Sequence, residues 1–323
     1  MLPNAHSPRS PLAIPAVQSH NARMSFVFEP SGSLADQLAA LDQGCAVRVS
    51  NDRVIAVRGK DRVEWVSGMV TNEVKSVTPG ATRYAAIVHE KGKLLADVWI
   101  LARVDDVLLV APTETIAALL EHFDKHIIME DVEVAATEDR VVLAAGARSQ
   151  SVFVPDGARS FATARLARPG VDLIADEALM STIRARVEAG DAVAVSDEAW
   201  AIVRLEAGMP QWGVDFGAEN YVQEADITRR AVSFNKGCYV GQEVVCRLEM
   251  RGHVRRQLVT LRIPGEPVPA GTAVGETGSV TSSAPSRTPG ESVAFAMVKW
   301  DVATSALELD VAGRVARVVR VGA

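Results

Sequence analysis

The sequence predicts an α+β protein that ends in a small β-barrel. Residues 83–89 and 94–101 have the pattern of two strands joined by a short loop, and a helical pattern follows at 114–128. A hairpin flanked by helices is typical of an α+β lobe. Similar elements follow within residues 141–208, which predicts a second lobe. From Arg256 onward, short runs of branched residues alternate with loops rich in Pro, Gly and Ser, as in a small barrel or sandwich.

Length and composition predict a globular protein of two or three domains. The chain has 323 residues, of which 48% are hydrophobic and 23% charged. Its longest apolar runs are far shorter than the roughly 20 residues that span a bilayer, so we expect no membrane segment. The net charge of −6 argues against a protein whose main task is binding a phosphate backbone. The charge still leaves room for a local basic patch, so contact with tRNA is kept as an alternative.

The first 24 residues are predicted to be a disordered tail. Four prolines lie among small polar residues, and no acidic residue precedes Glu29. The tail lacks the apolar core of a secretory signal, so we expect a cytoplasmic protein, and Met24 is a possible true start. The three cysteines form no C-x-x-C pair, which suits a reducing compartment.

The first lobe is expected at residues 25–140 and begins with a helix at 34–41. Residues 46–58 then alternate branched apolar and polar side chains, as a pair of strands that turns at Asn51 and Asp52 would. Asp61 is placed to begin a helix that presents valines on one face.

The hairpin comes next in this lobe. Its two strands are joined by residues 90–93, where Gly92 supplies the unusual backbone angle that a tight loop requires. A strand at 107–110 follows, and helix 114–128 has an apolar stripe that includes Leu119 and Phe123.

The second lobe is expected at residues 141–255 and the barrel at 256–323. Strands are predicted at 141–145 and 170–175, followed by helices at 177–189 and 196–208. The second lobe also carries the stretch that we consider most informative, residues 236–243, with the sequence KGCYVGQE.

This stretch places a thiol in a turn between two glycines. Lys236 and the first turn of a following helix would favour the thiolate form of Cys238, which makes it a candidate reactive cysteine. Gly241 indicates either that the helix begins after it or that another group lies close to it. The alternative is that Cys238 is a small apolar filler in a structural turn.

Residues 236–243 resemble the signature of the YgfZ family, folate-binding relatives of the glycine-cleavage T-protein that support iron–sulfur enzymes. The resemblance implies three domains in a ring around a central folate site. It also implies Cys238 as the working thiol with Lys236 beside it, and it places Gln242 and Glu243 among the folate-binding residues.

Residues 204–209, RLEAGM, resemble an element shared by the YgfZ and T-protein families. A carboxylate pairs well with the ring edge of a pterin, and a cation suits the glutamate tail of folate, so Arg204 and Glu206 are candidate cofactor-binding residues. The alternative is an ordinary exposed ion pair between them.

On the hairpin, residues 92–97 resemble the T-protein's Gly-Gly-x-Ile-Asp-Asp. The chain keeps one acid, Asp97, and has Ala96 in place of the other. Nothing resembles the T-protein's Gly-Tyr-Thr-Gly-Glu, where the main pterin-anchoring carboxylate would lie. The resemblance implies that tetrahydrofolate or a derivative binds, with Asp97 at the site, whereas these two departures lead us to expect no aminomethyl transfer.

A cluster of cations follows the cysteine motif. Arg247 and Arg251 lie four residues apart on one predicted helix, ahead of His253, Arg255 and Arg256. They could hold a folate polyglutamate tail, an acidic partner or RNA phosphates, or simply complement the helix dipole.

No stable metal site is predicted. His122 and His126 are four apart on a helix but lack a further ligand, so a solvated helix edge is the favoured interpretation. A resident iron–sulfur cluster normally takes four thiolates, so contacts with cluster proteins should be transient.

Three hypotheses follow. The first is a monomeric folate-binding accessory protein for iron–sulfur enzyme assembly or repair, either non-catalytic or cryptically catalytic, and the second is a folate-dependent one-carbon transferase. The third is a cysteine-nucleophile enzyme, which would need His89 or His253 near Cys238. The cysteine motif together with the missing pterin-anchoring stretch favours the first.

Overall fold

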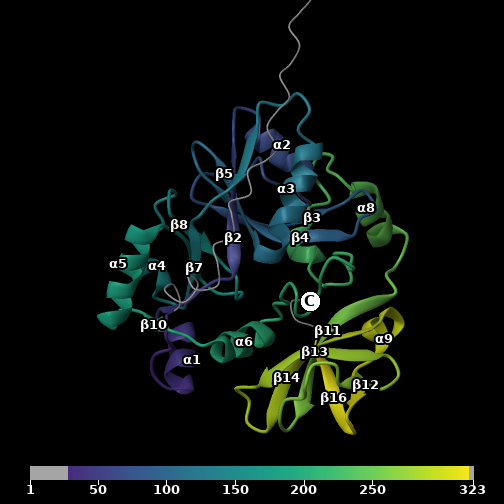
Figure 1. Cartoon of the computed structure of the whole chain (residues 1–323). Coiled ribbons are helices and arrows are strands. Elements are labelled where there is room, and N and C mark those ends of the chain that lie inside the picture. The colour runs from purple at the N-terminus through teal and green to yellow at the C-terminus, as the bar shows by residue number, and fades with distance from the viewer. Residues whose placement is uncertain (1–27, 320–323) are drawn as a thin grey trace, which may run out of the picture.

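Two five-stranded sheets pack face to face, and a closed barrel lies beside them (Figure 1). They are seen in a computed structural model that describes residues 28–319. The predicted N-terminal tail lies outside the described residues. None of the helices in this range has the length and hydrophobicity that crossing a bilayer requires.

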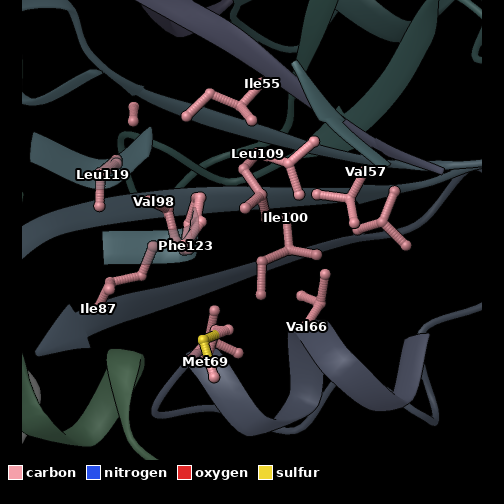
Figure 2. Packing of buried hydrophobic residues seen from close by; sticks show 14 of the residues in the cluster. Ile55, Val57, Val66, Met69, Ile87, Val98, Ile100, Leu109, Leu119 and Phe123 are labelled. Carbon is pink, nitrogen blue, oxygen red and sulfur yellow. The ribbon is translucent and has the colours of Figure 1, made fainter. Parts of the chain in front are cut away.

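The first sheet carries the predicted hairpin. Its strands, in spatial order, are β3 (Thr82–Val88), β4 (Leu94–Ala102), β5 (Val107–Pro112), β2 (Asp52–Arg58) and β6 (Glu133–Ala136). Helices α2 (Arg62–Met69) and α3 (Ile116–Lys125), the latter preceded by the 3-10 turn η2 (Thr113–Thr115), pack on one face. Figure 2 shows this core, in which Phe123 and Val66 meet alternate strand residues such as Val98 and Ile100.

The second sheet faces the other side of the first. Its strands, in spatial order, are β10 (Val193–Ala194), β1 (Ala46–Val49), β7 (Arg140–Ala145), β9 (Gly170–Ala175) and β8 (Ser160–Thr163). A shared core joins Val54 and Leu108 of the first sheet to Leu143 and Phe161 of the second. The outer face of the second sheet is covered by α4 (Ser149–Val152) and α5 (Glu177–Glu188).

The two predicted strands within residues 46–58 exist, but they do not pair with each other. β1 pairs with β7 and β10, whereas β2 pairs with β5 and β6. β1 is therefore a strand of the second sheet, and helix α1 (Leu34–Asp42) packs beside it. We had placed both in the first lobe. The reason is that strand patterning reports which face of a strand is buried and leaves its partner undetermined.

The C-terminal barrel is confirmed. Its strands are β11 (Arg256–Pro264), β14 (Glu291–Lys299), β13 (Gly278–Pro285), β12 (Ala273–Val274), β15 (Glu308–Val311) and β16 (Arg314–Val319), with α9 (Trp300–Ser305) at one end. Helix α6 (Asp197–Glu206) packs on the barrel through Ile202 and Leu205, which contact Phe295 and Met297.

A long connection with α7 (Thr228–Ala231) and α8 (Gln242–Met250) joins α6 to the barrel. Its apolar residues Val222, Ile227 and Val245 pack against Ala86 and Leu94 of the first sheet. The cysteine motif thus lies on the first sheet, although the sequence pattern had grouped it with the second lobe. Figure 1 shows α8 beside β3 and β4.

Candidate functional site

A cavity of about 180 Å³ opens where the two sheets meet α6 and the loop that follows α6. It is lined by charged and aromatic side chains from segments far apart in the chain. The main polar and aromatic ones are Arg48, Asp52, Tyr84, Asp97, Trp99, Glu114, Arg165, Trp200, Arg204 and Trp212. Of the predicted site residues, Asp97 and Arg204 are part of this lining.

Strand β4 aims Asp97 into the cavity. Side chains alternate along a strand, so Ala96 and Val98 enter the core with α2 and α3 while Asp97 and Trp99 face the cavity. The position that Ala96 occupies is fully buried among apolar side chains. A missing acid at residue 96 therefore takes no carboxylate away from the cavity.

The Asp97 carboxylate is only half satisfied within the protein. Tyr84 donates its hydroxyl to Oδ2 at 2.8 Å, whereas Oδ1 is shielded from solvent and has no hydrogen-bond partner in the described chain. Burial raises the pKa of this carboxyl from 3.8 to about 6, and the hydrogen bond from Tyr84 offsets part of the effect. An unpaired, shielded oxygen is ready to accept a hydrogen bond from a ligand.

Arg165 is a charge-paired, fixed part of the wall beside Asp97. Its guanidinium is paired with the fully buried Asp172 (Nη2–Oδ2, 2.8 Å) and with Asp52 (Nη1–Oδ2, 3.2 Å). It also lies 5.0 Å from the centre of the Trp99 ring, which in turn lies 5.1 Å from the Tyr84 ring. The result is a wall of Arg165, Trp99 and Tyr84, in which the two aromatic rings are tilted by 42° to each other and offer flat surfaces to a planar ligand.

Arg204 reaches the cavity from α6, but its partner is not Glu206. Its Nη1 pairs with the buried Asp215 at 2.6 Å, and Nη2 donates to Ser282 of the barrel at 3.1 Å. Its Nε is buried without a partner in the described chain. Across the cavity mouth, the Arg48 guanidinium lies 5.0 Å from the Trp200 ring.

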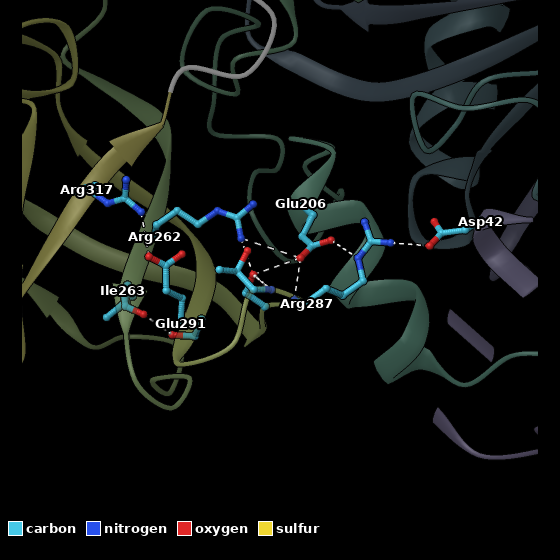
Figure 3. A network of polar contacts seen from close by, with 10 residues as sticks. Asp42, Glu206, Arg262, Ile263, Arg287, Glu291 and Arg317 are labelled. Atoms are coloured by element: carbon cyan, nitrogen blue, oxygen red, sulfur yellow. Dashed lines mark hydrogen bonds and ion pairs between the residues drawn. The ribbon is translucent and has the colours of Figure 1, made fainter. Parts of the chain in front are cut away.

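Glu206 lies away from the cavity, in an ion network that joins α6 to the barrel (Figure 3). It pairs with Arg287 through Nε and accepts the backbone N–H of Arg287 at 2.8 Å, and Arg287 also contacts Asp42 of α1 at 2.7 Å. Residues two apart on a helix point in different directions, so Arg204 and Glu206 face different surroundings. The alternative of an exposed ion pair between Arg204 and Glu206 is therefore wrong, and of the two candidate cofactor-binding residues only Arg204 lines the cavity.

Cys238 is exposed and is not among the residues that line the cavity. The following helix α8 begins after Gly241, whose φ of +78° is left-handed. A Cβ at this glycine would lie 2.5 Å from the carbonyl oxygen of His89. Both reasons considered for a glycine here, a helix start and a close approach, are thus present.

Lys236 is buried and is therefore not an exposed cation beside the thiol. Its ammonium donates to the carbonyl oxygens of Ser67, Val70 and Asn72 at 2.6 to 2.9 Å. Burial lowers the pKa of this lysine to about 8. An ammonium has three donors, so none is left for the Cys238 thiolate.

The remaining predicted ligand residues lie on α8 or just after it. Glu243, Arg247 and Arg251 are exposed, Gln242 is half-buried, and none of the four lines the cavity. Arg247 faces Glu243 at 4.0 Å, a weak helix-surface pair. The folate-binding role expected for these residues has no support in their positions.

The histidines that we considered as metal ligands or as partners of Cys238 make other contacts. His126 Nε2 lies 3.9 Å from Glu90, but within residues 28–319 no group of three or more His, Cys, Asp or Glu side chains is arranged to hold a metal. His253 stacks on Trp300 of the barrel, with ring centroids 4.4 Å apart. His89 accepts the backbone N–H of Lys91 through Nδ1.

Several residues of the site were not identified from sequence: the lining residues Arg48, Tyr84, Trp99 and Arg165, and Asp215, which pairs with Arg204. One usable signal was the alternation on β4, which puts Trp99 on the same face as Asp97. Another was a lone arginine, Arg48, in an otherwise apolar strand. Arg165 and Asp215 come from loops and carried no local signal.

Comparisons with known proteins agree with this architecture. Residues 25–154 match the family model described as the GCVT N-terminal domain. The chain is 26% identical over 224 residues to the tRNA-modifying protein YgfZ of Sodalis glossinidius (strain morsitans), covering 64% of this chain and 68% of that protein. It is also 26% identical over 240 residues to the YgfZ of Colwellia psychrerythraea, covering 69% and 73%.

Among solved structures, the glycine cleavage system aminomethyltransferase T of Bartonella henselae has a similar fold. The TM-score is 0.79 at 18% sequence identity, and the match covers 93% of this chain and 95% of that one. The α+β class and the T-protein-like arrangement with a C-terminal barrel are confirmed. This chain is similar in sequence to the YgfZ proteins, has the fold of the glycine-cleavage T-protein, and matches the GCVT N-terminal domain at residues 25–154.

Proposed function

We propose that the cavity binds a reduced folate, tetrahydrofolate or a derivative of it. The observation that carries the proposal is the unpaired Oδ1 of Asp97, shielded from solvent beside the neighbouring rings of Tyr84 and Trp99. The N–H edge of a pterin ring can donate two hydrogen bonds to a carboxylate, and its flat face can stack on aromatic side chains. The similarity to YgfZ proteins supports this assignment.

The charges around Asp97 suit the rest of such a ligand. Folate carries carboxylates on its glutamate tail, and Arg48 and Arg204 supply cations at the cavity wall. Asp215 and Ser282 hold Arg204 in place through hydrogen bonds, so little side-chain entropy is lost when a ligand binds. A bound folate would supply one-carbon chemistry, while the protein would bind, orient and desolvate it.

We further propose that the protein is an accessory factor in iron–sulfur cluster assembly or repair, with Cys238 as its working thiol. Because Cys238 is exposed and absent from the cavity lining, its chemistry would be directed at a transient protein partner. The curated relatives are named tRNA-modifying proteins, and we propose that the supported enzymes here act in tRNA modification.

Isothermal titration with tetrahydrofolate tests the ligand. We expect micromolar affinity for the wild type, about 8 kcal/mol of binding free energy. Asp97→Asn keeps the shape and one acceptor for Tyr84 but removes the charge, so affinity should fall at least about tenfold, since hydrogen bonds to charged groups contribute about 1.5 to 3 kcal/mol.

The matched control is Asp176→Asn, which makes the same change at the N-cap of α5, outside the cavity. It should bind tetrahydrofolate as the wild type does. An absence of binding heat at millimolar ligand would refute the folate assignment, and equal affinities for wild type and Asp97→Asn would move the ligand elsewhere.

The thiol is tested by complementation with Cys238→Ala in a strain that lacks its own homologue, read as the activity of a cluster-dependent enzyme. We expect a normally folded variant that binds folate but fails to support that enzyme. Full complementation would show that the cysteine motif is a structural turn without a working thiol.

The alternative function is a folate-dependent one-carbon transferase. The observation in its favour is Asp97 itself, a cavity carboxylate whose pKa of about 6 permits proton exchange near neutral pH. Incubation with an aminomethylated lipoyl carrier protein and tetrahydrofolate should release only background ammonia. Ammonia release above background that is lost in Asp97→Asn would favour the one-carbon transferase over the accessory protein.

A further inference from the structure

Lys236 is bound to the end of helix α2 by its whole ammonium group. Ser67 lies in the last turn of α2 and Val70 is its C-cap, and their carbonyls accept at 2.6 and 2.7 Å. Asn72 accepts the third hydrogen bond at 2.9 Å. Carbonyls at a helix C-terminus lack partners within the helix and favour a cation. Lys236 therefore caps a helix whose C-cap residue lies 166 residues earlier in the chain.

The loop around Cys238 is held to the same place on both sides of Lys236. The backbone N–H of Ser233 donates to the Thr71 carbonyl at 3.0 Å, and that of Val240 donates to the Gly68 carbonyl at 3.1 Å. The loop between these two bonds is otherwise exposed at Phe234, Asn235, Gly237 and Cys238. Two side chains of the loop are buried, Lys236 at 9% exposure and Tyr239 at 7%, and of the two only Lys236 donates hydrogen bonds to the end of α2.

Lys236 connects with the wall of the cavity. Asn72, whose carbonyl accepts from Lys236, donates its side-chain amide to the Tyr84 carbonyl at 2.8 Å and to the Arg230 carbonyl at 2.9 Å. Tyr84 is the residue whose hydroxyl contacts Asp97. The thiol loop and the cavity are thus built on one hydrogen-bonded framework.

We propose that Lys236 is a positioning residue for Cys238, which holds the loop on the end of α2 so that the thiol is presented to a partner in one conformation. An electrostatic activator would need its charge directed at the sulfur, whereas the Lys236 ammonium directs its three N–H groups at carbonyl oxygens and lies 5.1 Å from the Tyr239 ring. This inference rests on the proposed function of Cys238 as a working thiol.

The test measures alkylation of Cys238 by iodoacetamide between pH 6 and 10 on the full chain, with the cysteines resolved by peptide mass spectrometry. Amide hydrogen exchange of residues 233–240 is followed on the same samples. The variants are Lys236→Met, which removes charge and donors, and Lys236→Arg, which keeps the charge but whose planar fork cannot match three converging carbonyls. Lys75→Met, an exposed lysine paired with Glu64, is the matched control.

We expect loop exchange to rise at least about tenfold in Lys236→Met and in Lys236→Arg, because buried hydrogen bonds to a charged group are lost. The pH at which Cys238 alkylation is half-maximal should be the same in both variants as in the wild type. Lys75→Met should change neither quantity. If Lys236→Met does not fold, Lys236→Gln, which keeps two donors, takes its place.

Two outcomes overturn the proposal. One is an alkylation midpoint that rises by a pH unit or more in Lys236→Met and returns to the wild-type value in Lys236→Arg, since charge alone would then explain the lysine. The other is unchanged loop exchange in both variants. Complementation by Cys238→Ala would refute the working thiol, but the exchange data would still decide whether Lys236 holds the loop.

Discussion

Asp97→Asn should make the protein more stable at neutral pH, although it removes the carboxylate that we assign to the ligand. Burial raises the pKa of Asp97 from 3.8 to about 6, so the folded state favours the neutral carboxyl. Stability from this group is complete below the unfolded pKa and is lost as the pH rises through about 6. Asparagine is neutral at every pH and avoids this loss.

The magnitude follows from the shift. A rise from 3.8 to about 6, at about 1.4 kcal/mol per pKa unit, corresponds to about 3 kcal/mol. The Asp97 side chain is partly exposed, so solvent screening reduces the expected gain to about 1 to 2 kcal/mol above pH 7. Tyr84 can still donate to the asparagine oxygen, so the hydrogen bond is kept.

The assay is the melting temperature of both proteins at pH 5 and pH 8, without ligand. The variant should melt a few degrees higher at pH 8, and the difference should shrink at pH 5. Asp176→Asn is a control of opposite sign, because hydrogen bonds from backbone N–H groups at the start of α5 lower the pKa of Asp176. A variant that is less stable than the wild type by the same amount at both pH values would refute the reasoning.

Two further predictions concern packing and the ion network. Gly241→Ala should lower the free energy of unfolding by about 1 kcal/mol more than Gly190→Ala does. Both glycines have a φ of +78°, but only at Gly241 does a backbone oxygen lie 2.5 Å from the added Cβ. Equal losses in the two variants would contradict the close approach. Arg287→Met should cost about 1 to 3 kcal/mol because it leaves the buried Glu206 without its main partner, whereas Arg317→Met, at an exposed pair, should cost less than about 1 kcal/mol. Equal losses of unfolding free energy in the two variants would show that the Glu206 network stabilises the fold no more than an exposed ion pair does.

The sequence alone determined the longer helices, most of the longer strands and the barrel, because these depend on local periodicity. The hairpin at β3 and β4, helix α3 and the change of pattern at Arg256 were all predicted from neighbouring residues. A short motif likewise indicated the relationship to the YgfZ proteins. These features need only a few consecutive side chains, and the physical preferences behind them act within one turn or one strand.

Only the tertiary structure decided which strands are partners and which charges meet. It separated β1 from β2, paired Arg204 with Asp215 in place of Glu206, and set Lys236 under the thiol loop. Asp97 was predicted, but its unpaired oxygen and its raised pKa depend on Tyr84 and on burial between two sheets. Such contacts join segments up to hundreds of residues apart, and a local pattern carries no information about which distant side chain will lie across a cavity.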